Sequence, residues 1–312
     1  MDIVILCDVD FAGNMYNLAS SVNRFTSHKA LAIKRRVNHR FKYPSMLLAQ
    51  SSNMTKVREL IYGADAIVWK EMPILHKIYG LDLTRIKDKE NIVILGGGGF
   101  RFPKIFKSNQ EFYKERINAK WAASSLDFLE WHPDWAWIPA SIRVDYLRET
   151  FQFEKSSPPL IVASPSNHTN SWLGVQEQFE KAMEALSNQR LAFQFRFILG
   201  EPNVRCLRWK APASIFFDRI FDIYGINSQE AGAFESAVIT GASDFVKTTL
   251  DENGYDCPFY FVESWSQAAK VMSKLLKNPE LMRQRGKECY EYVKKVHSGE
   301  LAAQHLVRLI EE

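Results

Sequence analysis

Two acidic residues bracket a loop in the second half of the chain. Asp222 and Glu230 have seven residues between them, and Tyr224 and Gly225 lie in that interval, just before an expected helix. A carboxylate accepts hydrogen bonds from two hydroxyl groups at once, which suits the hydroxyls of a sugar or a ribose. The open N-terminus of a helix offers backbone N–H groups and a positive dipole end to a phosphate oxygen. The spacing therefore indicates a site for sugar hydroxyls and a phosphate.

The same residues also have a purely structural interpretation. An acid such as Glu230 in the first turn of a helix interacts favourably with the helix dipole, and aspartate, the residue type at position 222, is common in turns. The residue types alone leave both interpretations open.

A run of four glycines, Gly96 to Gly99, follows an expected strand. Consecutive glycines cost backbone entropy on folding, so a ligand that closely approaches the backbone is a reason to keep them. The run lacks the G-x-G-x-x-G spacing of a dinucleotide-binding turn and the Gly-Lys-Ser/Thr of a Walker loop. We therefore expect a ligand-binding loop of neither of these kinds.

Apolar runs of strand length alternate with segments of helical period along nearly the whole chain. Such alternation is typical of α/β folds, in which helices cover parallel sheets. The segment from Pro139 to Pro159 has little periodicity and separates two series, so we expect domains at 1–150 and 151–312. The expected strands are 3–7, 30–33, 66–69, 92–95, 135–138, 160–163, 193–199, 215–217, 237–239 and 259–262, and the expected helices are 14–24, 175–186, 228–234, 264–276, 281–296 and 300–310.

The composition is that of an ordinary globular chain. Its 312 residues are 46% hydrophobic and 24% charged, which suits about two folded domains. No uncharged apolar run approaches the ~20 residues that a transmembrane helix needs, and the first residues lack the basic region of a secretory signal. We therefore expect a cytoplasmic protein, with four reduced cysteines that include no C-x-x-C pair and indicate no zinc site.

The net charge of +4 is unevenly distributed. The segment 29–42 contains basic residues and no acid. Such a run usually forms a solvated face, and it can also attract an anionic substrate, a membrane surface or DNA. Its six basic residues are Lys29, Lys34, Arg35, Arg36, Arg40 and Lys42.

The stretch from Ile215 to Gly241 resembles the signature of retaining GT-B glycosyltransferases of family 4. That signature has the form D-I-F-V-D-Q-x-x-x-x-Y-G-x-x-x-x-E-A-M-A-x-G-x-P-V, and this chain has S-I-F-F-D at 214–218, Y-G at 224–225 and E-A at 230–231. The resemblance implies two Rossmann-like domains that face each other across a cleft, with the C-terminal helix returning toward the N-terminal domain. It also implies a nucleotide-diphosphate sugar as donor, retention of configuration, and no cofactor or essential metal.

Carried over by position, the resemblance assigns roles to the residues of this stretch. Glu230 would bind the nucleotide ribose. Asp222 would lie near the donor sugar, at a position where the family usually has glutamate. The backbone N–H groups of the loop between them would contact the sugar and the diphosphate. The residues of this loop are Tyr224, Gly225, Ile226 and Asn227.

Other predicted site residues lie before this stretch. Gly13 would lie against the diphosphate because a side chain there would block close approach. Gly99 and Arg101 fall where the catalytic loop of the family's first domain begins. Asn167 belongs to the donor-binding segment that opens the second domain.

The chain departs from the family where two cations neutralise the leaving diphosphate. In the best alignment His168 stands at the family's arginine and Leu173 at its lysine. Fixed cations in such a site stabilise the leaving group by several kcal/mol, roughly. Three interpretations stay open: Arg205, Arg208 or Lys210 replaces them, the donor is bound differently, or the protein is a weak or inactive relative.

We therefore expect a hexosyltransferase-type glycosyltransferase. It would move a sugar from a nucleotide sugar, such as a UDP- or GDP-sugar, to an acceptor hydroxyl of a glycan, a lipid-linked sugar or another molecule. Two alternatives remain open. One is a GT-B glucosyltransferase acting on modified DNA, with the basic run along the phosphates, and the other is a non-enzymatic nucleotide-sugar-binding relative.

Overall fold

The computed structural model describes residues 1–36, 47–70, 75–96, 110–111, 113–151, 153–164, 172–220 and 223–312. These residues form two compact units. One consists of Met1–Ser141 and Gly299–Glu312, and the other of Ile142–Ser298. We expected the first domain to end at residue 150, whereas the first unit ends at Ser141 and includes the C-terminal segment.

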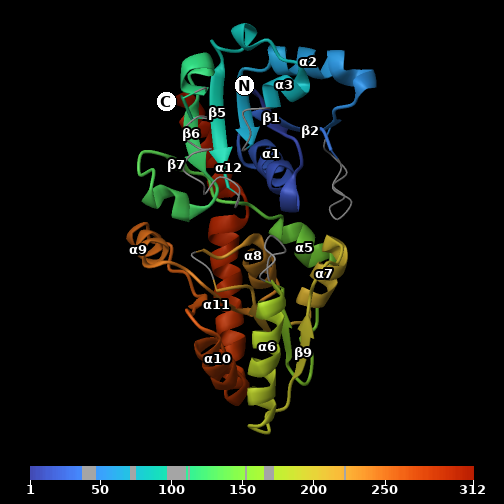
Figure 1. The fold of residues 1–312 in the computed structure, drawn as a ribbon, viewed down its shortest axis with the longest axis vertical. Coiled ribbons are helices and arrows are strands. Elements are labelled where there is room, and N and C mark those ends of the chain that lie inside the picture. The colour runs from blue at the N-terminus through green and yellow to red at the C-terminus, as the bar shows by residue number, and fades with distance from the viewer. Residues whose placement is uncertain are drawn as a thin grey trace. The chain divides into compact units, whose positions relative to one another are not determined.

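The first unit is built on a parallel sheet of seven strands in the order β3-β2-β1-β4-β5-β6-β7 (Figure 1). Helices cover both faces of a parallel sheet, so its strands are continuous apolar runs, as in β1, where the five residues after Asp2 are buried. The strands are β1 (Asp2–Cys7), β2 (Lys29–Lys34), β3 (Leu47–Leu48), β4 (Ala66–Lys70), β5 (Glu90–Leu95), β6 (Lys120–Ala123) and β7 (Ala136–Trp137).

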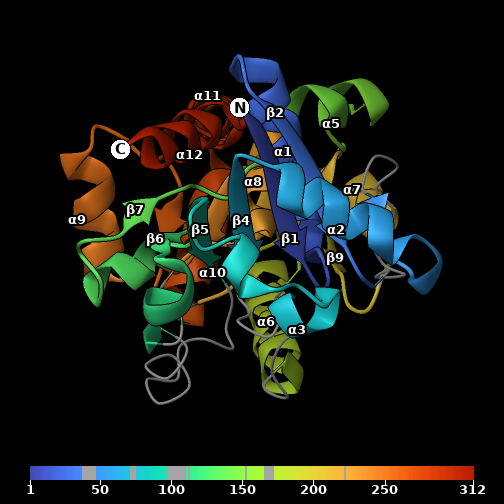
Figure 2. The same cartoon turned by 90° about the horizontal axis from the view of Figure 1, so that it is seen from above.

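Helices cover both faces of this sheet (Figure 2). On one face Leu18 of α1 and Leu306 of α12 pack in one buried cluster with Ile5 of β1. On the other face Ile61 of α2 and Tyr79 of α3 belong to a second cluster. The C-terminal helix therefore packs on the sheet of the first unit, as expected. The helices are α1 (Asn14–Phe25), α2 (Met54–Gly63), α3 (Leu75–Tyr79) and α12 (Glu300–Glu311).

The second unit contains a parallel sheet of five strands in the order β12-β11-β10-β8-β9. One face packs against α6 and α10, where Met183 and Met272 join Phe217 of β10 in one core cluster. The strands are β8 (Leu160–Ala163), β9 (Gln194–Phe197), β10 (Ile215–Phe217), β11 (Ala237–Thr240) and β12 (Tyr260–Phe261). The helices are α5 (Val144–Thr150), α6 (Trp172–Ser187), α7 (Asn203–Lys210), α8 (Ile226–Ala233), α9 (Asp244–Glu252), α10 (Trp265–Lys277) and α11 (Pro279–His297).

The α/β fold class predicted from the sequence is confirmed. Every expected strand and helix is present, with ends that differ by a few residues at most. Strands β3 and β6 and helices α2 and α3 of the first unit were not predicted from the sequence, and neither were helices α5, α7 and α9 of the second unit.

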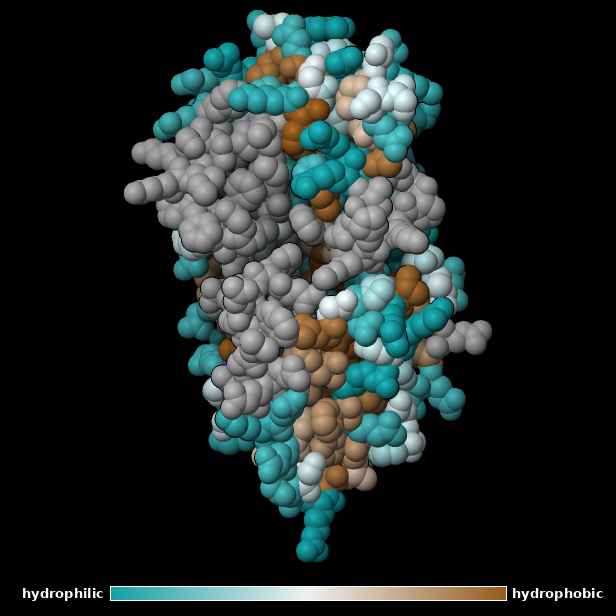
Figure 3. All heavy atoms as spheres, turned by 45° about the vertical axis from the view of Figure 1, so that its right-hand side comes forward, coloured by the Kyte–Doolittle hydropathy of each residue, from teal (hydrophilic) through white to brown (hydrophobic). Residues whose placement is uncertain are grey.

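An apolar strip lies on the surface of the second unit, on the side where Figure 1 places α6, β9 and α7 (Figure 3). Phe195 of β9 and Val204 of α7 are exposed by 51% and 49%. β9 ends the strand order of its sheet, so Phe195 lies on an edge strand. Among the helices of the described residues, none is long and apolar enough to cross a membrane.

Two glycines allow α8 and α11 to approach each other closely. A Cβ atom at Gly232 of α8 would lie 2.8 Å from a methyl carbon of Val293, and one at Gly286 of α11 would lie 2.2 Å from the carbonyl oxygen of Glu235. The second contact involves a backbone atom, which cannot move aside as a side chain can. Close packing thus fixes α8, the helix of the predicted site, against α11.

Gly286→Ala should destabilise the second unit by about 1–3 kcal/mol, because the new methyl group overlaps a backbone oxygen. The control is Gly63→Ala at the end of α2, where an added Cβ meets no atom within 4 Å. There the higher helix propensity of alanine should leave stability unchanged or raise it by up to ~1 kcal/mol. Thermal unfolding followed by circular dichroism measures both variants, and equal Tm values would contradict the close helix contact.

Candidate functional site

The predicted site loop begins where β10 ends and closes at the N-terminus of α8. Asp218 follows β10 and is buried. Its Oδ2 atom accepts hydrogen bonds from the backbone N–H of Gly225 at 3.0 Å and from the Ser228 hydroxyl at 2.8 Å. One carboxylate oxygen thus accepts hydrogen bonds both from the residue before α8 and from the first turn of α8. The sequence analysis gave Asp218 no role, although an acid directly after a buried strand was a usable signal.

A side chain at Gly225 would crowd two neighbouring side chains. A Cβ atom there would lie 2.9 Å from Arg219 Nη2 and 3.1 Å from Asp218 Oδ2. The Gly225 N–H is already bonded to Asp218, so it is not available to a ligand in this arrangement. In the first turn of α8, the backbone N–H groups of Ile226 and Asn227 have no partner among the described residues.

A buried ion pair joins α7 to α8. Lys210 is fully buried, and its Nζ lies 2.5 Å from Glu230 Oε2 and 2.6 Å from Asn227 Oδ1. Glu230 is 6% exposed, and its other oxygen, Oε1, accepts a 3.3 Å hydrogen bond from Asn203 Nδ2. One cation therefore holds two of the predicted site residues. The sequence analysis named Lys210 only as a substitute for a missing diphosphate cation, and gave Asn203 no role.

Asn227 also ties the site to the neighbouring strand. Its Nδ2 donates a 3.0 Å hydrogen bond to the carbonyl oxygen of Ser164, the residue that follows β8. Asp218 likewise follows β10, which pairs with β8 in parallel. The site therefore lies at the carboxyl edge of this sheet, which is where open α/β sheets bind ligands.

The side chain of Tyr224 points into the core of the second unit. Its hydroxyl lies 2.6 Å from the Tyr292 hydroxyl and 3.0 Å from His297 Nε2. Burial raises the pKa values of Tyr224 and Tyr292 well above the usual value. Tyr224 thus anchors the loop to α11, and its ring is not available for direct contact with a ligand.

Five predicted site residues lie outside the described residues, namely Gly99, Arg101, Asn167, His168 and Asp222.

Among the three candidate cations, Arg205 and Arg208 are exposed, and Arg205 pairs with Glu201 at 3.3 Å. In the described part of the chain, Lys210 is the one of these three that contacts a predicted site residue, Glu230.

Gly13 precedes α1 in a left-handed conformation with φ 69°, next to Ala12 at φ 56°. This turn brings the buried Asp10 carboxylate to the backbone N–H groups of Met15 and Tyr16, at 2.9 and 3.0 Å. Burial raises the pKa of Asp10, and these two hydrogen bonds act in the opposite direction. The backbone conformation alone therefore favours glycine at position 13.

The basic run does not form one solvated face, and the expectation is wrong for Lys34. Lys29 is exposed at the start of β2, whereas Lys34 ends this strand and is buried. Five steps along an extended strand separate the two by about 17 Å. Arg35 and Arg36 are exposed beyond the strand, and Arg36 pairs with Asp8. Arg40 and Lys42 lie outside the described residues.

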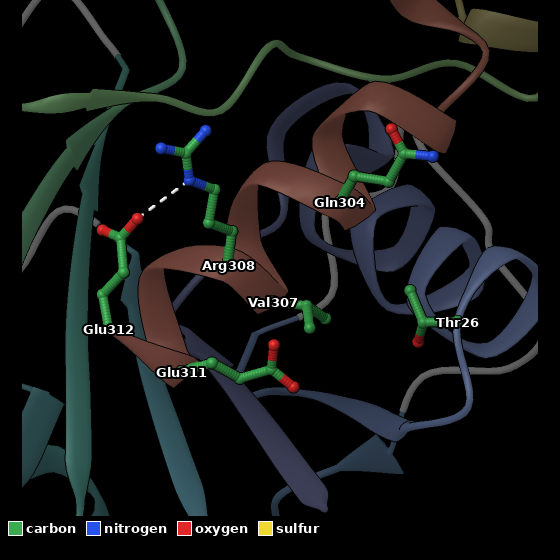
Figure 4. Close-up of a pocket in the computed structure, with 6 residues that line it drawn as sticks. All are labelled: Thr26, Gln304, Val307, Arg308, Glu311 and Glu312. Atoms are coloured by element: carbon green, nitrogen blue, oxygen red, sulfur yellow. Dashed lines mark hydrogen bonds and ion pairs between the residues drawn. The ribbon is translucent and has the colours of Figure 1, made fainter.

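A surface pocket lies between α12 and the residue that follows α1 (Figure 4). Within it Arg308 Nε pairs with Glu312 Oε1 at 2.8 Å. None of the predicted site residues lines it, and it forms no part of the candidate site. The lining residues are Thr26, Gln304, Val307, Arg308, Glu311 and Glu312.

The described part of the chain contains no group of three or more His, Cys, Asp or Glu that could hold a metal ion.

No protein-family model matches the sequence, and no curated protein matches it. Solved structures do match, over nearly the whole chain. HepE from Anabaena, in complex with UDP and glucose, has a TM-score of 0.65 at 9% identity, covering 100% of this chain and 99% of that chain. WaaG, a glycosyltransferase involved in lipopolysaccharide biosynthesis, has a TM-score of 0.51 at 14% identity, with coverages of 97% and 98%.

A UDP-GlcNAc 2-epimerase from Neisseria meningitidis, bound to UDP-GlcNAc, is also similar, with a TM-score of 0.56 at 10% identity and full coverage of both chains (100% and 100%). At these identities the likeness shows the fold, which is the GT-B type with two Rossmann-like units. A glycosyltransferase and an epimerase share this fold, so the reaction has to be argued from the site.

Lys210→Met should lower the free energy of unfolding of the second unit by about 3–5 kcal/mol, because the Glu230 carboxylate stays buried without its cation. The double variant Lys210→Met/Glu230→Gln should recover most of this loss, since it removes both charges. Urea unfolding measures all variants. A surface control, Arg205→Met, should change stability by less than about 1 kcal/mol. A double variant as unstable as Lys210→Met would contradict the coupling of the two side chains.

Proposed function

We propose that this protein is a retaining glycosyltransferase of the hexosyltransferase type. It moves a sugar from a UDP- or GDP-sugar to an acceptor hydroxyl of a glycan or a lipid-linked sugar, with no cofactor or essential metal. The observation that carries the proposal is the fixed Glu230 carboxylate beside the unpaired N–H groups in the first turn of α8. Retention and the family-4 assignment rest on the resemblance of the stretch from Ile215 to Gly241.

Glu230 has the acceptor capacity that a ribose requires. A carboxylate offers about four lone-pair positions, and Lys210 and Asn203 occupy one on each oxygen. One position on each oxygen is left for the two neighbouring hydroxyls of the ribose. Because Lys210 already holds the carboxylate in place, ligand binding costs little additional side-chain entropy.

The N-terminus of α8 complements the diphosphate. The Ile226 and Asn227 N–H groups and the positive end of the helix dipole are placed to bind phosphate oxygens. Gly225 serves this arrangement by allowing the loop to pack closely, and Tyr224 serves it by anchoring the loop. We assign the donor sugar to Asp222. The remaining donor-side residues are Asn167 and His168, with His168 next to the leaving diphosphate.

In the proposed reaction the bond between the anomeric carbon and the diphosphate oxygen breaks, and the leaving diphosphate takes the electron pair. A bond forms between the anomeric carbon and the acceptor oxygen, and the acceptor hydroxyl gives its proton to the departing diphosphate. The N–H groups at α8 stabilise the charge that develops on the diphosphate. The first unit contributes Gly13 next to the diphosphate, together with Gly99 and Arg101 in the catalytic loop.

The solved structures support a nucleotide-sugar ligand, because HepE was observed with UDP and glucose and WaaG is a glycosyltransferase. The epimerase bound to UDP-GlcNAc favours a second candidate, namely inversion at C2 of a UDP-sugar. Both candidates use the same ribose and diphosphate contacts. They differ in whether an acceptor takes the sugar.

NMR spectroscopy of the reaction products separates the candidates. A new glycosidic bond with the donor's anomeric configuration supports the proposal, and inversion at C2 without transfer would establish the epimerase. Binding of a nucleotide sugar without transfer or hydrolysis, over a panel of acceptors, would identify a non-enzymatic binder. Strongly salt-dependent binding to duplex DNA would point to a DNA acceptor.

Glu230→Gln should weaken UDP or GDP binding at least tenfold, roughly, because a neutral amide replaces charge-assisted hydrogen bonds to the ribose. Glutamine keeps the size of the side chain, but it leaves the buried Lys210 without its counter-charge, so the variant should also lose stability. Isothermal titration calorimetry measures the affinity, with a thermal scan to confirm folding. As a control, Glu235→Gln alters a carboxylate that pairs with Arg148 at 2.9 Å, outside the site, and should keep the original affinity. Unchanged affinity in folded Glu230→Gln would refute the assignment.

A further inference from the structure

Two helices of the second unit, α7 and α8, supply the polar side chains of the candidate site, and two lysines connect these helices. Lys210, the last residue of α7, bonds to Asn227 and Glu230 of α8. The second lysine, Lys155, lies between α5 and β8 and bonds to the C-terminal ends of both helices. The sequence analysis gave Lys155 no role.

Lys155 Nζ donates hydrogen bonds to backbone carbonyl oxygens at the ends of these helices. It lies 2.5 Å from the carbonyl oxygen of Phe234, the residue that caps α8. It lies 3.4 Å from that of Ala211, which caps α7 and directly follows Lys210, and 2.5 Å from that of Ala213. The three protons of one ammonium group therefore join the end of α8 to the end of α7.

A cation at this place is favourable for both helices. Carbonyl groups in the last turn of a helix have no partner within the helix, and they form the negative end of the helix dipole. Hydrogen bonds from a charged donor to such groups are about twice as strong as those between neutral groups. An ammonium group shared by two helix ends therefore holds each end relative to the other. Because Lys210 directly precedes Ala211, a shift of the end of α7 also moves Lys210 relative to Glu230.

The backbone around Lys155 is itself held in place. The N–H of Ser156 donates a 3.1 Å hydrogen bond to the carbonyl oxygen of Pro212, which follows the cap of α7. The ring of Phe153 packs against that of Phe234, with 5.7 Å between the ring centroids. Lys155 therefore reaches both helix ends from a fixed position, so its charge acts directly on the two helices.

The surroundings of Lys155 make its charge sensitive to pH. Burial lowers the pKa of Lys155 to about 7, against the nearby Glu235 carboxylate, which acts in the opposite direction. The Arg148 guanidinium of α5 acts in the same direction as burial. The thiol of Cys289 in α11 is also near, but burial raises its own pKa to about 12, so it is neutral. The ammonium form of Lys155 is therefore the main form below this pH, and the neutral amine is the main form above it.

We propose that Lys155 is a positioning residue of the candidate site, whose ammonium form holds the ends of α7 and α8 together and thereby sets the position of Lys210 against Glu230. The part of this inference that concerns nucleotide affinity rests on the proposed function, in which Glu230 binds the ribose. A neutral amine has two protons and no charge, so it bonds the helix ends more weakly than an ammonium group does. Nucleotide binding therefore weakens as the pH rises and Lys155 loses its charge.

Isothermal titration calorimetry with UDP at pH 6 tests this role. Lys155→Met should bind UDP about tenfold more weakly, which is the size of effect that loss of a supporting hydrogen bond has at metal sites. Arg148→Met is the matched control and should keep the original affinity. Arg148 donates a 3.1 Å hydrogen bond to the carbonyl oxygen of Ala233 at the end of α8, and none of its contacts within the described residues reaches α7. With folding checked by a thermal scan, unchanged affinity in Lys155→Met, or an equal loss in Arg148→Met, would overturn the proposal.

The pH profile separates a positioning cation from a side chain that only packs. The ratio of the UDP affinity of the unaltered protein to that of Lys155→Met should be about ten at pH 6 and fall toward one by pH 9, where Lys155 is neutral. Protonation of UDP itself affects both proteins equally and cancels in this ratio. A ratio that stays constant from pH 6 to pH 9 would contradict the proposal.

Urea unfolding without nucleotide separates this inference from the proposed function. In the Lys210→Met/Glu230→Gln background no ion pair remains to be positioned, so Lys155→Met should lower the urea midpoint less than it does in the unaltered protein. Arg148→Met should lower it equally in both backgrounds. If this pattern appears while UDP does not bind, the positioning role stands and the proposed function fails. If UDP binding depends on Glu230 and Lys155→Met shows neither effect, the proposed function stands and the positioning role fails.

Discussion

The buried ion pair between Lys210 and Glu230 is the interaction on which the candidate site depends. Both charged groups are buried, so the removal of one leaves the other without a counter-charge. The pair joins α7 to α8, and through Asn227 it also reaches the end of β8. The carboxylate of the candidate site is thereby also a structural element. Its position is set before any ligand arrives, which is what preorganised binding requires.

The sequence predicted the fold well because the dominant signal, the apolar run of a strand covered on both faces, is local. The prediction missed strands in which this apolar run is short. β6 has only the four residues K-W-A-A, of which the first two are partly exposed, and β3 has two residues. Both become strands through pairing with neighbours that are distant in the chain, such as β5 beside β6. Tertiary pairing of this kind cannot be inferred from the residues of the strand itself.

The candidate site was predictable in part for the same reason. The spacing of Glu230 and the glycine before α8 are local features, and they led to the N-terminus of α8, where Lys210 contacts both Asn227 and Glu230. The partner of Glu230 is Lys210, 20 positions away, and nothing in the separation of these residues marks them as a pair. Lys34 illustrates the opposite error. A run of basic residues suggested a solvated face, whereas the strand period places Lys34 with Ala32 on the inner face.

The two units place a buried lysine near the carboxyl edge of a parallel sheet, but they differ in what accompanies it. In the second unit a carboxylate neutralises Lys210, and the oxygens of Glu230 that face no cation remain suited to hydroxyl groups. In the first unit both oxygens of Asp10 accept backbone N–H groups at the start of α1, and Lys34 has no hydrogen bond or ion pair within the described residues. Similar architecture therefore leaves a carboxylate with open lone pairs in the second unit and a carboxylate occupied by its own backbone in the first. The difference follows from the position of a single acid relative to each lysine, and not from the fold.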